Sequence, residues 1–228
     1  MNHTKKVLIL DSGTLINLSM NGLLYILEEL KKTTSVRLAI TKAVKYETID
    51  RPAGIPRFEL GALEINNLLI SNILELPQSF NIEEKQLNTR TNILLEEANH
   101  ALQSYDTAIT IVSTAEMSCL ALSSLLEKEG FETLIAIDER TTRTLCEKPE
   151  NLEQIMSSKL HREITLNKKN LTEFKNYRFI RSTELVYIAY KKGLLRIKDP
   201  KALEAALYAT KFKGAAVSFE EINILKKL

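Results

Sequence analysis

Val7-Leu8-Ile9-Leu10-Asp11-Ser12-Gly13-Thr14 is a short apolar run that ends abruptly in a carboxylate, followed by two hydroxyls and a glycine. Four uninterrupted apolar residues are typical of a strand whose sheet is covered by helices on both faces. In such sheets, ligands bind beyond the carboxyl ends of the strands. We therefore expect Asp11 at a functional sheet edge, although an aspartate that simply begins a loop explains it equally well.

The rest of the chain alternates short apolar runs with stretches of helical spacing. Further strands are expected at 36–40, 72–76 and 134–137, and 109–112 is ambiguous between strand and loop. Helices are expected at 15–18, 23–30, 41–49, 57–69, 82–105, 113–129, 139–146, 152–160, 182–192, 200–214 and 219–228. This alternation predicts an α/β protein, a three-layer α/β/α sandwich around a central parallel sheet.

Composition indicates an ordinary globular protein of the reducing compartment. Of 228 residues, 44% are hydrophobic and 26% charged, and no apolar run approaches the length of a membrane span. The first residues do not have the pattern of a signal peptide. The two cysteines, Cys119 and Cys146, lie in helix-like patterns and suggest neither a disulfide framework nor a zinc site. We expect a cytoplasmic protein with no membrane association.

Charge is distributed unevenly along the chain. Residues 1–139 hold 12 basic and 19 acidic residues, whereas residues 140–228 hold 19 basic and 10 acidic residues. An acidic N-terminal part and a basic C-terminal part suit a protein that binds cations with the first and polyanions with the second. Solvated helix faces would give the same imbalance. Pro149 is the best boundary, dividing a domain at 1–148 from a basic, mainly helical extension at 149–228.

Four acids occupy places that a parallel sheet brings to one edge: Asp11, Glu47, Glu116 and Asp138. Clustered carboxylates repel one another unless a cation offsets the repulsion, and hard oxygen ligands suit Mg²⁺ or Mn²⁺. Each acid also has a structural explanation. Glu47 fits a solvated helix face, Ser113 and Glu116 form a capping box, and Asp138 fits a helix N-cap.

The order of these acids resembles the PIN-domain family. The resemblance is carried by Val7 to Ile16, Thr41 to Glu47, Thr114-Ala115-Glu116 with Ala121, and Ile135-Ala136-Ile137-Asp138-Glu139-Arg140. It spans residues 5 to about 147, roughly two thirds of the chain. Glu116 departs from the aspartate of many toxin-type relatives, and residues 150–228 lie outside the family's core.

The resemblance implies a metal-dependent nuclease, usually acting on RNA. It makes Asp11, Glu47, Glu116 and Asp138 the metal ligands. Ser12 or Thr14 then supplies a supporting hydroxyl, and Glu139 a further carboxylate.

Basic residues of the back half are candidates for phosphate contacts: Arg140, Arg143, Arg162, Lys168, Lys169, Arg178 and Arg181. Arg140 and Arg143 adjoin Asp138 and are the favoured pair, although solvated surface side chains explain them equally well. Tyr177 and Phe179 could stack on unpaired bases, although core packing explains them slightly better.

Other chemistries find little support. The three histidines are isolated, and no glycine-rich phosphate loop is present. Ser12-Gly13-Thr14 lacks the aspartates that a haloacid-dehalogenase phosphatase needs.

The leading hypothesis is a divalent-metal-dependent endoribonuclease, a hydrolase whose expected substrate is single-stranded RNA. The alternative is a PIN-like protein that binds RNA or a protein partner without cleaving. A third hypothesis is a toxin–antitoxin role, in which the extension at 149–228 binds an antitoxin or a second copy of the chain in a homodimer.

Overall fold

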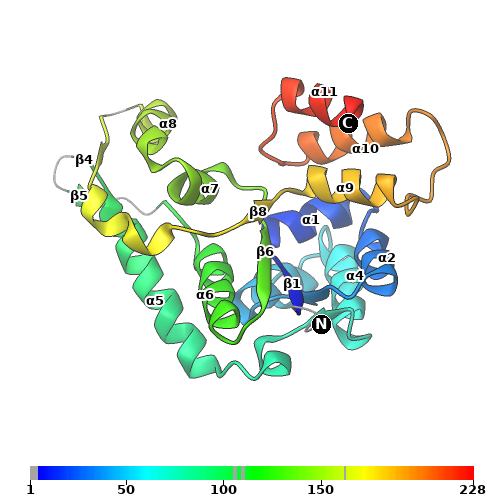
Figure 1. The fold of residues 1–228 in the computed structure, drawn as a ribbon, viewed down its shortest axis with the longest axis horizontal. Coiled ribbons are helices and arrows are strands. Elements are labelled where there is room, and N and C mark those ends of the chain that lie inside the picture. Colours follow the sequence, from blue (N-terminus) through cyan, green and yellow to red (C-terminus); the bar gives the residue numbers. More distant parts are fainter. Residues whose placement is uncertain (1–4, 105–106, 109–110, 162) are drawn as a thin grey trace.

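A parallel sheet forms the centre of the molecule (Figure 1). The structure is a computed structural model that describes residues 5–104, 107–108, 111–161 and 163–228. Within these residues the central sheet has five strands, all parallel, in the order β3-β2-β1-β6-β8. The strands are β1 (Lys6–Leu10), β2 (Arg37–Ala39), β3 (Leu74–Glu75), β6 (Glu132–Ala136) and β8 (Phe179–Ile180). The expected α/β class with a parallel sheet is thus confirmed.

The longest pairing runs between β1 and β6. Leu8 pairs with Leu134 and Leu10 with Ala136, so the two strands end side by side. The first strand expected from sequence matches β1 closely. β8 was not expected, because its two apolar residues stand alone in a basic, weakly patterned segment.

Helices fill the segments between the strands, close to the ranges expected from sequence. The α-helices are α1 (Ser12–Met20), α2 (Tyr25–Thr33), α3 (Lys42–Lys45), α4 (Glu59–Ile70), α5 (Glu84–Ala101), α6 (Thr114–Lys128), α7 (Arg140–Glu147), α8 (Leu152–Leu160), α9 (Ser182–Lys191), α10 (Ala202–Phe212) and α11 (Phe219–Lys227). Shorter turns are the π-helical η1 (Tyr46–Asp50) and the 3₁₀ turns η2 (Pro52–Gly54), η3 (Pro77–Phe80), η4 (Pro149–Asn151) and η5 (Lys168–Phe174).

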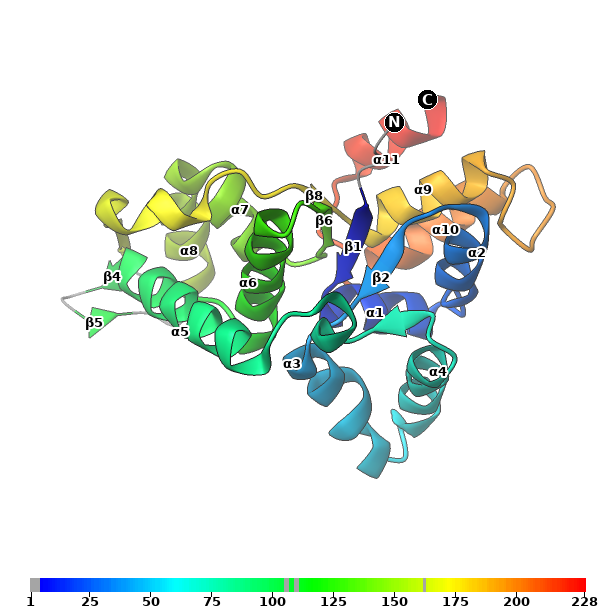
Figure 2. The same cartoon turned by 60° about the horizontal axis from the view of Figure 1, so that its bottom comes forward.

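Helices cover both faces of the central sheet (Figure 2). Helices α5 and α6 lie on one side, and α1, α2, α9 and α10 lie on the other. Because both faces are covered, the central strands are mostly apolar after their first residues. In β1 every residue after Lys6 is buried.

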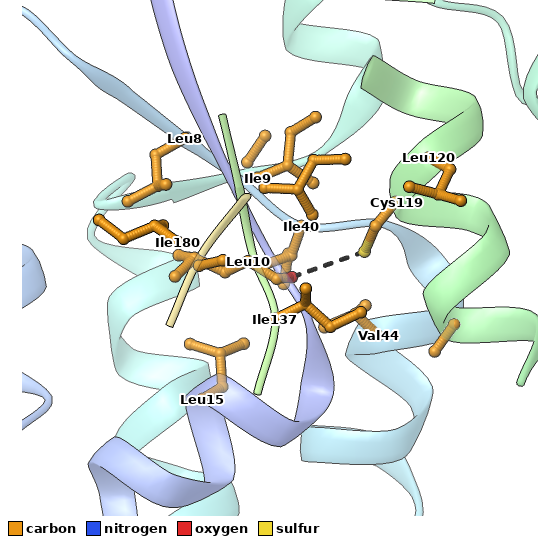
Figure 3. Close-up of a cluster of buried hydrophobic side chains, with 14 of the residues drawn as sticks. Leu8, Ile9, Leu10, Leu15, Ile40, Val44, Cys119, Leu120, Ile137 and Ile180 are labelled. Atoms are coloured by element: carbon orange, nitrogen blue, oxygen red, sulfur yellow. Dashed lines mark hydrogen bonds between the residues drawn. The ribbon is translucent and has the colours of Figure 1, made fainter. Parts of the chain in front are cut away.

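The main core lies between β1 and α6 (Figure 3). Ile9 lies there with Ile40 and Leu120, whereas Leu8 lies on the other side of β1, towards Ile180. The thiol of Cys119 lies 3.9 Å from the carbonyl oxygen of Leu10, so α6 is held against the end of β1. This contact places the start of α6 next to the residue that follows β1, Asp11.

A second, antiparallel sheet lies at the far end of α5 (Figure 1). It has the order β5-β4-β7, with strands β4 (Leu102–Ser104), β5 (Thr107–Ala108) and β7 (Thr165–Leu166). Helix α5 ends at Ala101, before the end expected from sequence, and Tyr105 lies outside the described residues. The ambiguous stretch 109–112 is also described only in part, from Ile111 onward.

Residues after Pro149 contribute to the same core as residues before it. Strand β8 pairs with β6, and Leu152, Leu185 and Leu207 are buried in the continuous apolar core. The division into 1–148 and 149–228 stays a prediction. Of the helices in the described ranges, none has both the length and the apolar character needed to cross a bilayer.

Candidate functional site

The candidate site lies where β1 and β6 end. The chain runs from β1 to β2 on one side, whereas β6 lies on the other side of β1, so the strand order reverses between them. Such a reversal opens a crevice at the carboxyl ends of the strands. The backbone N–H of Asp11 donates to the carbonyl of Ala136 (3.0 Å), which holds the two strand ends together. The structure therefore places Asp11 at the edge expected from sequence.

Asp11 is a buried carboxylate with one free oxygen. It caps α1 by accepting the N–H of Gly13 at Oδ2 (3.1 Å), and only 3% of the residue is exposed. Its Oδ1 is buried without a hydrogen-bond partner among the described residues. Gly13 permits this tight turn, because a Cβ there would stand 3.3 Å from Oδ2.

Burial raises the pKa of Asp11 from its usual 3.8 to about 7, and the charges of Glu116 and Glu47 add to the increase. The N–H groups of Gly13 and Ser12 oppose it but do not cancel it. Three of the four predicted acids therefore share one electrostatic field.

Glu116 begins α6 in the capping box that the sequence indicated. One carboxylate oxygen, Oε2, accepts the N–H of Ser113 (2.7 Å), and the Ser113 hydroxyl accepts the N–H of Glu116 (3.2 Å). Burial raises the pKa of Glu116, the Ser113 N–H opposes the rise, and the charge of Glu139 adds to it. Glu139 caps α7 by accepting the N–H of Thr142 (2.9 Å). The structural and the functional explanation of Glu116 are compatible, since its capping uses one oxygen.

Glu47 approaches from a different element. It lies in the first turn of η1, and π-helical turns are rare and frequent at functional sites. Thr41 caps the preceding α3 by accepting the N–H of Val44 (3.2 Å), as expected from sequence. The hydroxyls of Thr41 and Ser118 lie 2.7 Å apart, which ties α3 to α6 and brings Glu47 towards Asp11.

Asp138 is oriented differently from the other three acids. Its Oδ2 accepts the side-chain N–H of Asn17 (2.9 Å), and its Oδ1 accepts the backbone N–H of Ser182 (2.8 Å). Burial raises the pKa of Asp138 and these two donors oppose the rise. Asp138 therefore joins α1, β6 and α9, and each oxygen keeps one lone pair.

Asn17 is a site residue that the sequence reasoning missed. Its amide also donates to the carbonyl of Thr210 (2.9 Å), so it links Asp138 to α10. A buried amide between Leu15 and Leu18 was the available signal, because buried amides usually have hydrogen-bond partners.

The donor set fits Mg²⁺ or Mn²⁺ by chemistry. Among the described residues, no three His, Cys, Asp or Glu side chains stand close enough to form a closed metal cage. Mg²⁺ keeps several waters and is usually held by only one or two protein carboxylates, so a cage is not required. Asp11 Oδ1 is a hard oxygen without a partner, and the buried hydroxyls of Ser12 and Thr14, in the turn that follows Asp11, are also unpaired within the described chain. Buried polar atoms left without partners are destabilising, so this edge suits water and a cation.

Three hydroxyl side chains lie close to the acids: those of Ser12 and Thr14 near Asp11, and that of Thr142 near Glu116. The hydroxyls of Ser12 and Thr14 are buried beside Asp11 in the first turn of α1 and bond to none of the described groups. The Thr142 hydroxyl lowers the pKa of Glu116 through its proximity.

The basic residues predicted to bind phosphate divide into two groups. Arg143 pairs with Glu147 (3.3 Å), Arg178 with Glu132 (2.8 Å), and Arg181 with Glu184 and Glu221. Arg140 is exposed and, within the described residues, forms no ion pair. Arg162 and the side chains of Lys168 and Lys169 lie outside the described part. Tyr177 and Phe179 are half-buried against the core.

Helices α7 and α8 stand opposite α10 and α11 (Figure 1). Residues of α7, of the η4 turn and of the α10–α11 region line a polar cleft of about 580 Å³. Arg140, Arg143 and Lys148 line one wall, and Lys211 and Ser218 line the other. Ala216, also in the lining, donates its N–H to the carbonyl of Asp138 (3.1 Å). The cleft therefore adjoins the strand-end site.

Comparisons with models of protein families, with curated proteins and with solved structures find no match for this chain.

Proposed function

We propose that the chain is a divalent-metal-dependent endoribonuclease of the PIN type. In this proposal the α/β fold is PIN-like, and residues 149–228 form a basic, mainly helical extension of the nuclease. One observation carries it: Asp11 is a buried carboxylate with an unpartnered oxygen, in the field of Glu116 and Glu47, where the strand order reverses. A carboxylate with a strongly perturbed pKa in such a place is a candidate functional group.

Asp11 Oδ1 would bind Mg²⁺ or Mn²⁺ directly, and Glu47, Glu116 and Asp138 would complete the acidic set around the hydrated ion. A divalent ion bound there supplies neutralisation of phosphate charge and activation of a water molecule for phosphodiester hydrolysis. Asp11 has to release its proton before Oδ1 can bind a cation, because a pKa of about 7 leaves it about half protonated at neutral pH. Asn17 and Ser182 fix the orientation of Asp138. Arg140, with no acidic partner among the described residues, is available to hold a backbone phosphate.

Cleavage of a single-stranded RNA labelled at both ends tests the proposal. The wild type is expected to cut internally with Mn²⁺ or Mg²⁺ and not with EDTA, and Asp11→Asn is expected to abolish cutting. Asp199→Asn is the matched control, since Asp199 is exposed and its cap on Lys201 is one that asparagine can also form. Equal cutting by the wild type and Asp11→Asn assigns the activity to a contaminant and refutes the site.

Asp138→Asn changes both the carboxylate and its hydrogen bond with Asn17, so its activity has to be compared at equal folded fraction. The new amide would face Asn17, whose own amide N–H groups already point at Asp138 and at Thr210. Loss of activity in this variant counts for the site only where the folded fraction is unchanged.

The second candidate is a PIN-like protein that binds RNA or a protein partner and does not cleave, including a toxin–antitoxin role. It is favoured by Asp138, which already accepts two hydrogen bonds. RNA binding without cleavage in Mg²⁺ and in Mn²⁺ would support it.

A further inference from the structure

Three aromatic side chains form a surface cluster at the junction of α10 and α11. The ring centroids of Tyr208 and Phe212 lie 6.2 Å apart with nearly parallel planes, and Phe219 lies 6.1 Å from Tyr208 and 6.3 Å from Phe212. Phe212 is 72% exposed and Phe219 is 53% exposed. A phenylalanine of a globular protein usually buries its ring, so two such exposed rings in contact form a surface that suits a ligand.

The cluster borders the polar cleft. Lys211 and Ser218 line the cleft, and their chain neighbours Phe212 and Phe219 belong to the cluster. The ammonium group of Lys211 lies 4.4 Å from the centre of the Phe219 ring and donates to the carbonyl of Val217. A ligand that lies in the cleft can therefore reach the rings directly.

The charges of the cleft favour a polyanion. Its two acids, Glu147 and Glu221, are each paired with an arginine, Arg143 and Arg181. The remaining cations of the lining are Arg140, Lys148 and Lys211, and none of them forms an ion pair with a described residue. A cleft with cations that lack acidic partners, bordered by exposed rings, is the combination that single-stranded nucleic acids bind: phosphates contact the cations and unpaired bases stack on the rings.

We propose that Phe212 and Phe219, with Tyr208 behind them, form a base-stacking platform for single-stranded nucleic acid whose backbone lies in the adjoining cleft. The inference deepens the proposed nuclease function, because it assigns the recognition of unpaired bases to α10 and α11. It differs from the expectation from sequence, which gave the stacking role to Tyr177 and Phe179.

Binding measured without cleavage separates this inference from the proposed function. The probe is a fluorescein-labelled 12-nucleotide single-stranded RNA, followed by fluorescence anisotropy in EDTA at fixed salt. Asp11→Asn is expected to bind as the wild type does. The double variant Phe212→Leu/Phe219→Leu keeps apolar side chains but no ring, and should lose roughly 5- to 100-fold in affinity. Phe212→Tyr/Phe219→Tyr restores the rings and should restore binding.

Two controls fix the interpretation. Phe58→Leu changes another exposed phenylalanine, on the N-terminal side of α4, and should leave affinity unchanged. Arg140→Ala should weaken binding and reduce its salt dependence, whereas the leucine variants should keep the wild-type salt dependence.

Equal affinity of the leucine variant and the wild type overturns the platform, as does an equal loss of binding to a duplex of the same sequence. A change of oligomeric state in the leucine variant, with RNA binding intact, also overturns it and makes the cluster an interface between copies. If the wild type binds through the rings but never cleaves, the platform stands and the nuclease proposal fails. If the leucine variant cleaves RNA as fast as the wild type, the nuclease proposal stands and the platform fails.

Discussion

Asp11→Asn should stabilise the metal-free protein at alkaline pH. An acid whose pKa rises on folding binds its proton more tightly in the folded state, so the folded state loses stability as pH rises from the unfolded to the folded pKa. For Asp11 this window runs from about 4 to about 7. The asparagine variant carries no charge and escapes this loss.

The size of the effect follows from the shift. A pKa that moves from 3.8 to about 7 corresponds to a loss of folding free energy of roughly 4 kcal/mol, at 1.36 kcal/mol per unit. The wild type shows this loss in full by pH 8 and almost none of it at pH 4. Because Asp11 is buried, solvent screens its carboxyl little. Asparagine can still accept the Gly13 N–H, so the helix cap survives the substitution.

Urea unfolding at pH 4, 6 and 8 in EDTA measures the effect. The difference in unfolding free energy between variant and wild type should change in favour of the variant by about 4 kcal/mol between pH 4 and pH 8. Saturating Mn²⁺ at pH 8 should stabilise the wild type, by about 2.7 kcal/mol at a hundred times Kd, and not the variant. A difference that does not change with pH would refute the assignment of a buried, charge-coupled carboxylate to Asp11.

Three further perturbations test neighbouring parts of the site. Asn17→Ala removes a donor to the buried Asp138 and should lower the unfolding free energy by about 2 kcal/mol; because the Asp138 pKa then rises further, urea unfolding should show a larger loss at pH 8 than at pH 5. Ser113→Ala removes the cap of α6 and should lower stability by about 1 kcal/mol and reduce metal affinity in calorimetric titration, whereas Ser218→Ala in the equivalent box of α11 should leave metal affinity unchanged. Arg140→Ala should raise the KM for RNA at low salt and leave the melting temperature within experimental error, since the side chain is exposed and unpaired among the described residues.

The strand-end position of Asp11 was predictable because it depends on local pattern alone. Four apolar residues before a carboxylate are enough to indicate a buried strand and its edge. The capping box of Ser113 and Glu116 was predictable for the same reason, since all its hydrogen bonds lie within four residues.

The surroundings of Asp138 were not predictable from pattern. Its donors, Asn17 and Ser182, lie 121 and 44 residues away in the chain, and only the folded topology brings them together. Strand β8 escaped prediction because two residues carry no readable period. The aromatic platform was missed likewise, because Phe212 and Phe219 belong to different helices and meet only through the turn between them.

The bonds to Asp138 also determine when the site can be complete during synthesis. Asn17 and Asp138 are made early, but Ser182 and the Thr210 carbonyl leave the ribosome tens of residues later. At 5–20 residues per second, the interval between residues 138 and 210 lasts roughly 4 to 14 seconds. Asp138 lacks its Ser182 donor for the first 44 residues of that interval. The Asn17 amide lacks its Thr210 acceptor until the interval ends, so the hydrogen-bond network around Asp138 is complete only after residue 210 has been made.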